Sequence, residues 1–190
     1  MRWDSLFSDL EAQFSAERAL RDESEITERA RVELGGIELS DRLRGVVGSG
    51  IKVMLMDGSV LQGGLSHVGS EWIVLTEGAR QWLIPHGSVL SYQGLGRLAV
   101  KEASRVQRSL GIASALRALS RGRIPLVVHL AVRNSGGHKL DGVIDRVGSD
   151  HFDLAVVLQG EERRAGSVAA VVTVPFVAFT AISSPGAQGL

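Results

Sequence analysis

The chain has 190 residues, of which 44% are hydrophobic, so it is long enough for one large domain or two small ones with a sizeable core. It contains no cysteine, which excludes a disulfide framework, a thiolate metal site and a thiol nucleophile. Its 21 basic and 21 acidic residues cancel, but residues 1–44 hold 7 basic against 11 acidic residues and residues 96–123 hold 7 against 1. The charge therefore lies in two segments of opposite sign.

Residues 1–44 are expected to form an acidic N-terminal helical segment. Apolar residues recur there at helical spacing: Trp3, Leu6, Phe7, Leu10 and Phe14. Opposite charges also lie four residues apart, as in Glu17–Arg21 and Glu25–Arg29. The stripe is expected to pack on the rest of the protein or on its own copy in a dimer. The segment is acidic and lacks a basic flank followed by an apolar run, so we expect a soluble, cytoplasmic protein without a membrane partner.

Residues 45–95 predict a first small β-domain. Ile51, Val53 and Leu55 alternate into Asp57-Gly58, a strong signal for a tight hairpin. The stretch 61–75 then predicts strand, turn and strand, with the alternation of Gly63, Leu65 and His67 on a buried face and Gly69 free to take positive φ. One further short strand is expected before Pro85 and another after it, which makes five strands in this domain. Meander strands this short are expected to curl into a barrel.

Residues 96–123 are expected to form a basic amphipathic linker helix. Arg97, Lys101, Arg105 and Arg108, spaced 4, 4 and 3, would form a basic stripe opposite an apolar face. Three interpretations remain open: the stripe contacts nucleic-acid phosphates, it pairs with the acidic N-terminal helix, or it is a solvated face.

Residues 124–182 predict a second small β-domain, followed by a disordered tail at 183–190. Residues 140–154 repeat 61–75 without a gap, with the shared pattern L-x-G-x-[LI]-x-x-V-G-S-[ED]-x-[IF]-x-L. Further on, aligning Ile84-Pro85 with Val174-Pro175 keeps the order strand, proline, closing strand in both copies. This alignment gives the second copy a longer hairpin that carries Arg163 and Arg164 at its tip. We therefore predict an α+β, mainly β protein with two tandem small β-barrels, each preceded by a helix.

The first copy resembles the Sm-like small barrel of the Sm, LSm and Hfq proteins, and it also resembles other SH3-like barrels. The resemblance rests on the order helix, V-x-L-x-D-G-x-x-x-x-G-x-L at residues 53–65, acidic turn and apolar strand, and on Ile84-Pro85-His86. It covers residues 46–92 well and 124–182 more loosely. It implies rings of six or seven barrels and binding of single-stranded RNA. Of the family's RNA-contacting positions, only the one at His86 keeps a chemically sensible side chain.

No catalytic set is apparent in the sequence. The five histidines lack metal-ligand spacing, and there is no phosphate-binding loop or nucleophile elbow. The acidic residues of the second copy could suggest a cation site, but a solvated strand face explains them better: Asp141, Asp145, Asp150 and Asp153. We expect no enzyme activity, no cofactor, no metal and no small-molecule substrate.

Two functions are consistent with these observations. The first is a nucleic-acid-associated protein, most simply one that binds single-stranded RNA, with candidate contacts at Arg97, Lys101, Arg105, Arg108, Arg163, Arg164 and His86. The second is a scaffold whose barrels associate edge to edge with copies of itself or with another protein, aided by the oppositely charged helices. The basic segment and the resemblance favour the first, and the near-neutral barrels favour the second.

Overall fold

The computed structural model describes residues 35–104, 109–131, 138–157 and 168–184. Residues from Leu39 onwards form one compact unit, which contains all the described strands. The N-terminal helix predicted before residue 35 and nearly all of the predicted tail lie outside the described residues. No helix in the described parts of the chain is long and apolar enough to cross a membrane.

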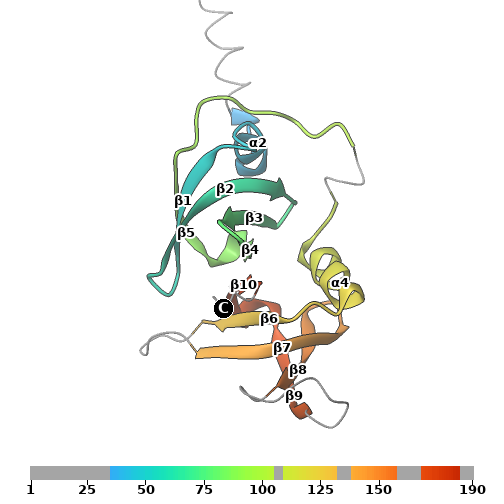
Figure 1. Ribbon diagram of the computed structural model, residues 1–190. Helices are drawn as coiled ribbons and strands as arrows, with labels where there is room; N and C mark the ends of the chain where they lie inside the picture. The colour runs from blue at the N-terminus through green and yellow to red at the C-terminus, as the bar shows by residue number, and fades with distance from the viewer. Residues whose placement is uncertain (1–34, 105–108, 132–137, 158–167, 185–190) are drawn as a thin grey trace, which may run out of the picture. The chain divides into compact units, whose positions relative to one another are not determined.

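The unit consists of two halves with the same order of elements (Figure 1). The first half, drawn from blue to green, contains α2 (Leu39–Arg44), β1 (Gly50–Leu55), β2 (Val60–Val68), β3 (Trp72–Glu77), β4 (Arg80–Pro85), the short helix η1 (His86–Ser88) and β5 (Val89–Gln93). The second half, drawn from yellow to red, contains α4 (Ile112–Gly122), β6 (Leu126–Leu130), β7 (His138–Val147), β8 (His151–Val157), β9 (Val168–Pro175), η2 (Phe176–Ala178) and β10 (Phe179–Ser183).

The ten strands of the described residues belong to one antiparallel sheet in the order β5-β1-β2-β3-β4-β10-β6-β7-β8-β9. The protein is mainly β, as predicted. The finer prediction of two closed barrels is not confirmed, because the sheet is open. Within the described residues no ladder joins β4 to β5 or β9 to β10, and β4 instead pairs with β10 of the other half.

The sequence repeat corresponds to a structural repeat. Residues 61–75 form β2 and β3, and residues 140–154 form β7 and β8. A β-bulge lies between Leu65 and His67 in the first copy and between Ile144 and Arg146, the equivalent residues, in the second. The bulge ends the predicted alternation, because it leaves His67 exposed although Leu65 is fully buried. The alignment of Pro85 with Pro175 is confirmed, since each precedes a short helix and a closing strand.

Two glycines of the repeat are required by close packing. A Cβ at Gly63 would lie 2.5 Å from the carbonyl oxygen of Thr76, and a Cβ at Gly142 would lie 2.3 Å from that of Ala155. The prediction for Gly69 is wrong, because its φ is not in the left-handed region. Gly69 instead leaves room for the indole of Trp72, which a Cβ would approach to 2.4 Å.

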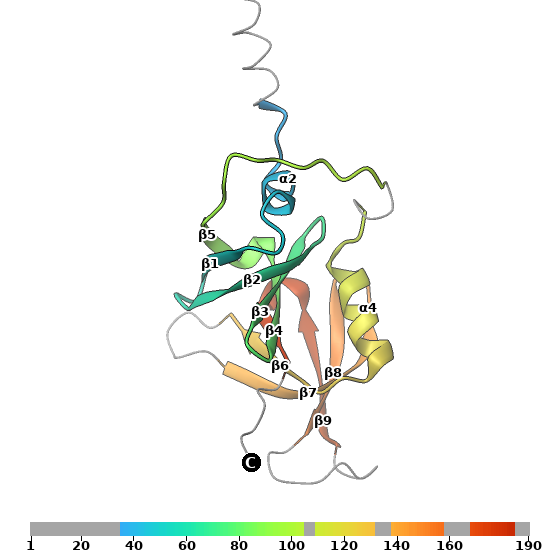
Figure 2. The ribbon, with the colours of Figure 1, turned by 45° about the horizontal axis from the view of Figure 1, so that its top comes forward.

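The apolar residues form two cores, one for each half. Ile51, Val53 and Leu55 alternate with exposed residues along β1 and fill the first core, as predicted. Leu116 of α4 packs into the second core with the strands of that half, and Figure 2 shows α4 alongside them. Hydrophobic burial on one face of each half therefore follows directly from the alternating pattern.

The predicted basic helix is much shorter than expected. Of its described residues, Ile112–Gly122 are helical and 96–104 are not, while 105–108 lie outside the described part of the chain. The non-helical segment after β5 begins at Gly94, whose φ is 98°. A hydrogen bond of 2.9 Å from the Val100 N–H to the Asp41 carbonyl holds this segment against α2. The apolar spacing of residues 99–110 is consistent with a helix, but contact with α2 holds part of the segment in a non-helical path.

Candidate functional site

The predicted basic stripe is not assembled by the structure. Arg97 and Lys101 are exposed, but they lie in the non-helical connection, where a spacing of four residues does not place side chains on one face. Arg105, Arg108, Arg163 and Arg164 lie outside the described residues. Nucleic-acid contact by these residues therefore stays a prediction.

His86 is half-buried and lies against Tyr92. Its Nδ1 is 2.7 Å from the Tyr92 hydroxyl, and the two rings meet edge to face. Burial lowers the pKa of His86, a nearby backbone carbonyl at Gly69 opposes this, and the positive charge of Arg44 adds to it. Burial also raises the pKa of Tyr92. His86 is therefore neutral near pH 7 and contributes no positive charge to a phosphate site.

The contact between the two halves is a strand ladder. β4 and β10 pair with Leu83 opposite Ile182 and Trp82 opposite Ser183. The ladder is extended by two bonds with Ser184: its N–H donates to the Gln81 carbonyl, and its hydroxyl accepts from the Gln81 N–H, both at 2.9 Å. Backbone bonding therefore makes the two halves one continuous sheet.

Side chains interlock across this ladder. Leu83 of the first half packs into the second core, and Ala181 of the second half packs into the first. Trp82 contacts His129 of β6 with ring centroids 5.0 Å apart, and Arg80 lies 5.6 Å above the Trp82 ring. Each half thus contributes to the core of the other.

Buried polar residues complete the junction. Ser88 donates to the Phe179 carbonyl at 3.0 Å, and the Nε2 of His129 lies 3.2 Å from the Ser183 hydroxyl. Thr180 is 1% exposed and its hydroxyl lies 3.3 Å from the His129 carbonyl. Desolvation raises the pKa of Asp57, but the hydrogen bonds that its carboxylate accepts from Ser59 and Thr180 have the larger combined effect. The pKa of Asp57 is therefore lowered. The buried hydroxyls of Ser88, Thr180 and Ser183 each have a hydrogen-bond partner, as burial requires, whereas Asp57 is exposed.

A second connection joins the β2–β3 turn to the start of α4. Glu71 Oε2 accepts a hydrogen bond from the Ile112 N–H at 3.0 Å, and the Trp72 indole N–H donates to the Leu110 carbonyl at 2.9 Å. A carboxylate is favourable at a helix N-terminus. The equivalent turn of the second half, at Asp150 and His151, is exposed, and its carboxylate lies 2.8 Å from the His151 ring instead.

The two ends of the sheet carry the same strand types as the junction. In the described residues, β5 and β9 pair with a neighbour on one side only. β5 is the equivalent of β10, and β9 is the equivalent of β4. All five residues of β10 are buried, whereas Leu90 of β5 is 58% exposed and Val171 of β9 is 59% exposed. Leu90 thus exposes an apolar side chain at the position of Thr180, which the junction covers, whereas Val171 corresponds to Gln81, which is exposed at the junction as well.

Sequence reasoning missed the junction. The sequence signal for the junction is the strand Phe179–Ser183. Its residues do not alternate strictly between apolar and polar, and all five are buried, so both faces of the strand are covered. Trp82-Leu83-Ile84 is likewise buried at three consecutive positions. Such a run indicates a strand covered on both sides.

The described residues contain no group of three or more His, Asp or Glu side chains that could hold a metal ion. Comparison with known proteins adds no assignment: no family model, no curated protein and no solved structure matches this chain.

Proposed function

We propose that this chain is a non-enzymatic structural protein that assembles end to end, with β9 of one copy pairing with β5 of the next. The observation that carries the proposal is the β4–β10 ladder, in which the same two strand types already pair within one chain. We interpret each half as an Sm-like or SH3-like small barrel, and the junction as the contact between neighbouring barrels.

The free edges are suited to this contact. At the junction Trp82 meets His129, and the equivalent positions at the ends of the sheet are Val172 on β9 and Met54 on β1. Met54 is 42% exposed. Thr180 of β10 is replaced by Leu90 on β5. The polar contacts of the junction are therefore replaced by apolar ones, whose burial favours association.

The two edges are different surfaces, so the contact is heterologous. Such contacts produce a closed ring or an open filament, according to the rotation between copies. An exposed strand edge with free backbone groups and apolar side chains is a known template for pairing. The same geometry therefore allows more than two copies to associate.

A cysteine pair tests the register. Transferring the junction to the ends places Gln93 opposite Val172, just as Ser183 lies opposite Trp82. The chain has no native cysteine. We expect Gln93→Cys combined with Val172→Cys to give a ladder of disulfide-linked oligomers on a non-reducing gel, because directly opposite residues meet the distance that a disulfide needs.

Each single cysteine variant is the control, since it can link at most two copies. A shifted pair, Ser91→Cys with Val172→Cys, should give fewer long species. A mass of 20.3 kDa, that of one chain, in sedimentation equilibrium across the accessible concentrations would contradict the proposal.

Nucleic-acid association is the second candidate function. It is supported by the excess of basic residues in 96–123 and by the exposure of Arg97, Lys101 and Arg121. The mechanism would be electrostatic tethering to phosphates with little base recognition. It is compatible with assembly, because the basic connection recurs in every copy.

Titration with mixed-sequence single-stranded RNA at two salt concentrations tests this function. If Arg97, Lys101, Arg105 and Arg108 contact phosphates, the log–log salt slope should be about 3, and changing all four to alanine should abolish binding. An unchanged affinity of that variant would assign any binding to another surface. Lack of binding at low salt would exclude this function and leave self-assembly.

A further inference from the structure

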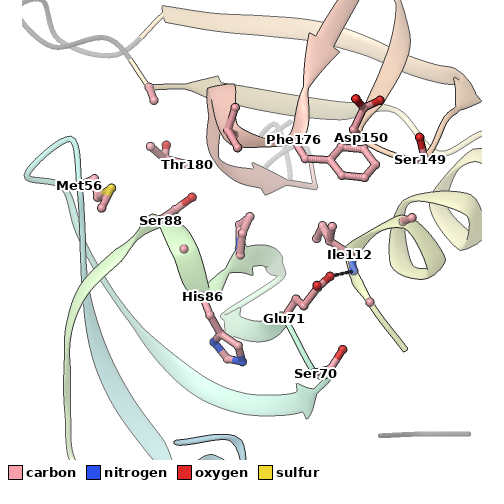
Figure 3. Close-up of a pocket in the computed structure, with 16 residues that line it drawn as sticks. Met56, Ser70, Glu71, His86, Ser88, Ile112, Ser149, Asp150, Phe176 and Thr180 are labelled. Carbon is pink, nitrogen blue, oxygen red and sulfur yellow. Dashed lines mark hydrogen bonds between the residues drawn. The ribbon is translucent and has the colours of Figure 1, made fainter. Parts of the chain in front are cut away.

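A cavity of about 660 Å³ lies beside the junction, between η1 of the first half and the start of β8, η2 and the start of α4 in the second (Figure 3). This volume is within the range of small-molecule sites, and the cavity opens to solvent. The proposed assembly does not use it, because the strand edges that pair are β5 and β9.

The walls of the cavity are mostly apolar. They come from both halves and include Met56, Pro85, Ile112, Ala131, Phe176 and Val177. Val177 is 92% exposed and Met56 is 61% exposed, so both present apolar surface at the mouth. An apolar molecule entering here would bury surface that the protein alone leaves in water.

The charged groups of the lining are acidic. Glu71 and Asp150 line the cavity from equivalent turns of the two halves, but the Asp150 carboxylate is exposed beside His151, so Glu71 is the acidic group at the cavity itself. No lysine or arginine is among the residues that line it. Glu71 gives Oε2 to the Ile112 N–H, which Figure 3 shows as a dashed line. Arg117 donates to the Gly148 carbonyl at 3.1 Å. It therefore lies next to the turn that carries Asp150, but it is not among the residues that line the cavity. The lining therefore disfavours an anion and accommodates a cation.

We propose that this cavity binds a small aromatic amine, with its ring against Phe176, Ile112 and Pro85 and its ammonium group toward the carboxylate of Glu71. The apolar walls supply the affinity, and the carboxylate of Glu71 supplies the selection of charge. A phosphate or a carboxylate ligand is rejected by the same group.

Two probes of the same shape and opposite charge test the proposal. We expect tryptamine to bind the full chain at least about fivefold more tightly than indole-3-acetate, since one partly screened ion pair contributes about that factor. Binding is measured by calorimetry and by saturation-transfer NMR. In the variant Glu71→Gln with Asp150→Asn, which keeps the shape of both side chains, this preference should disappear.

A filling variant tests the location. Gly87 lines the cavity, a Cβ there meets nothing within 4 Å, and valine stands at the equivalent position 177. Gly87→Phe should therefore fold and should weaken binding of tryptamine at least tenfold, whereas Leu90→Asp, at the sheet edge, should leave it unchanged.

Three outcomes would overturn the proposal. They are equal or reversed affinities of the two probes, unchanged binding in Gly87→Phe, and no binding of tryptamine up to about 1 mM, the weak limit for a fragment-sized ligand. None of them affects the proposed assembly, which the cysteine pair tests separately.

Discussion

Single residues decide how closely the strands of each half approach. Gly63 and Gly142 stand at the same place in the two copies, and each lies against a carbonyl of the neighbouring strand. Because the obstacle is backbone rather than a flexible side chain, it cannot move aside without shifting the strand. The shared glycine of the repeat is therefore explained by packing and not by a turn.

We expect Gly63→Ala to lower the free energy of unfolding by about 1–3 kcal/mol, the usual cost of overpacking. Gly64→Ala is the matched control, since a Cβ there lies 4.0 Å from the same carbonyl oxygen. Urea denaturation of both variants measures the difference. Equal midpoints would show that the strand adjusts without cost.

His86 predicts how stability depends on pH. Burial lowers its pKa in the folded protein below the ordinary value of 6.5, so unfolding takes up a proton at lower pH. The contribution is complete above about pH 6.5 and is lost as the pH falls below it. Burial lowers the pKa of His129 as well, which acts in the same direction.

His86→Phe should make stability less dependent on pH between about pH 5 and 7.5, because one of the two half-buried histidines no longer titrates. Phenylalanine already occupies the equivalent position at Phe176. Urea midpoints measured across this range give the slope. An NMR titration that finds an ordinary pKa for His86 in the folded protein would remove the basis of this prediction.

Among the helices and strands, one turn of the first half fixes a helix of the second. Glu71 accepts from the first turn of α4, and the Trp72 indole bonds the carbonyls of Leu110 and Gly111 at 2.9 and 3.2 Å. The turn thereby sets where α4 begins. Residues 99–110 have a helical apolar pattern, yet α4 starts only at Ile112.

Glu71→Ala should destabilise the protein by about 1 kcal/mol, the typical loss of a helix cap, and Glu71→Gln should recover most of it. Asp150→Ala is the control at the equivalent turn, where the carboxylate is exposed and caps no helix in the described residues. Thermal unfolding of the three variants distinguishes a cap from a general effect of removing negative charge.

In the molecule as a whole, two similar halves are joined in series in one sheet. The two free edges of that sheet are formed by different strands, β5 and β9. β10 is fully buried because β4 covers it, and its equivalent β5 lacks such a cover in the described structure. Leu90 and Val171 present apolar side chains at the two ends. Association at these ends is therefore expected to depend on Leu90, which takes the place of the buried Thr180.

We expect Leu90→Asp or Leu90→Lys to reduce the mass measured by light scattering to that of one chain, because a charge at the contact must be desolvated without a partner. Ile124→Asp is the control, since Ile124 is a comparably exposed apolar residue outside both edge strands. The circular dichroism of all three should match that of the unchanged protein. Retention of the assembled mass in both edge variants would place the contact elsewhere.

The repeated units can be predicted from local residue patterns. Alternation along β1, the Asp57-Gly58 turn and the shared glycines are local signals, because each depends on neighbouring strands within one half. The alignment of Pro85 with Pro175 follows from the same local order. The mainly β character of the fold is therefore readable from the sequence alone.

How the halves meet depends instead on contacts between distant segments. The pairing of β4 with β10 joins residues about a hundred positions apart, and neither strand alone specifies its partner. Such long-range contacts also accompany the late start of the expected helix at Ile112, leave Arg97 and Lys101 without helical spacing, and create the cavity. The intrinsic preference of a segment for helix or strand is weak, and packing between distant segments overrides it. The junction and its cavity could therefore not be predicted before the tertiary structure was known.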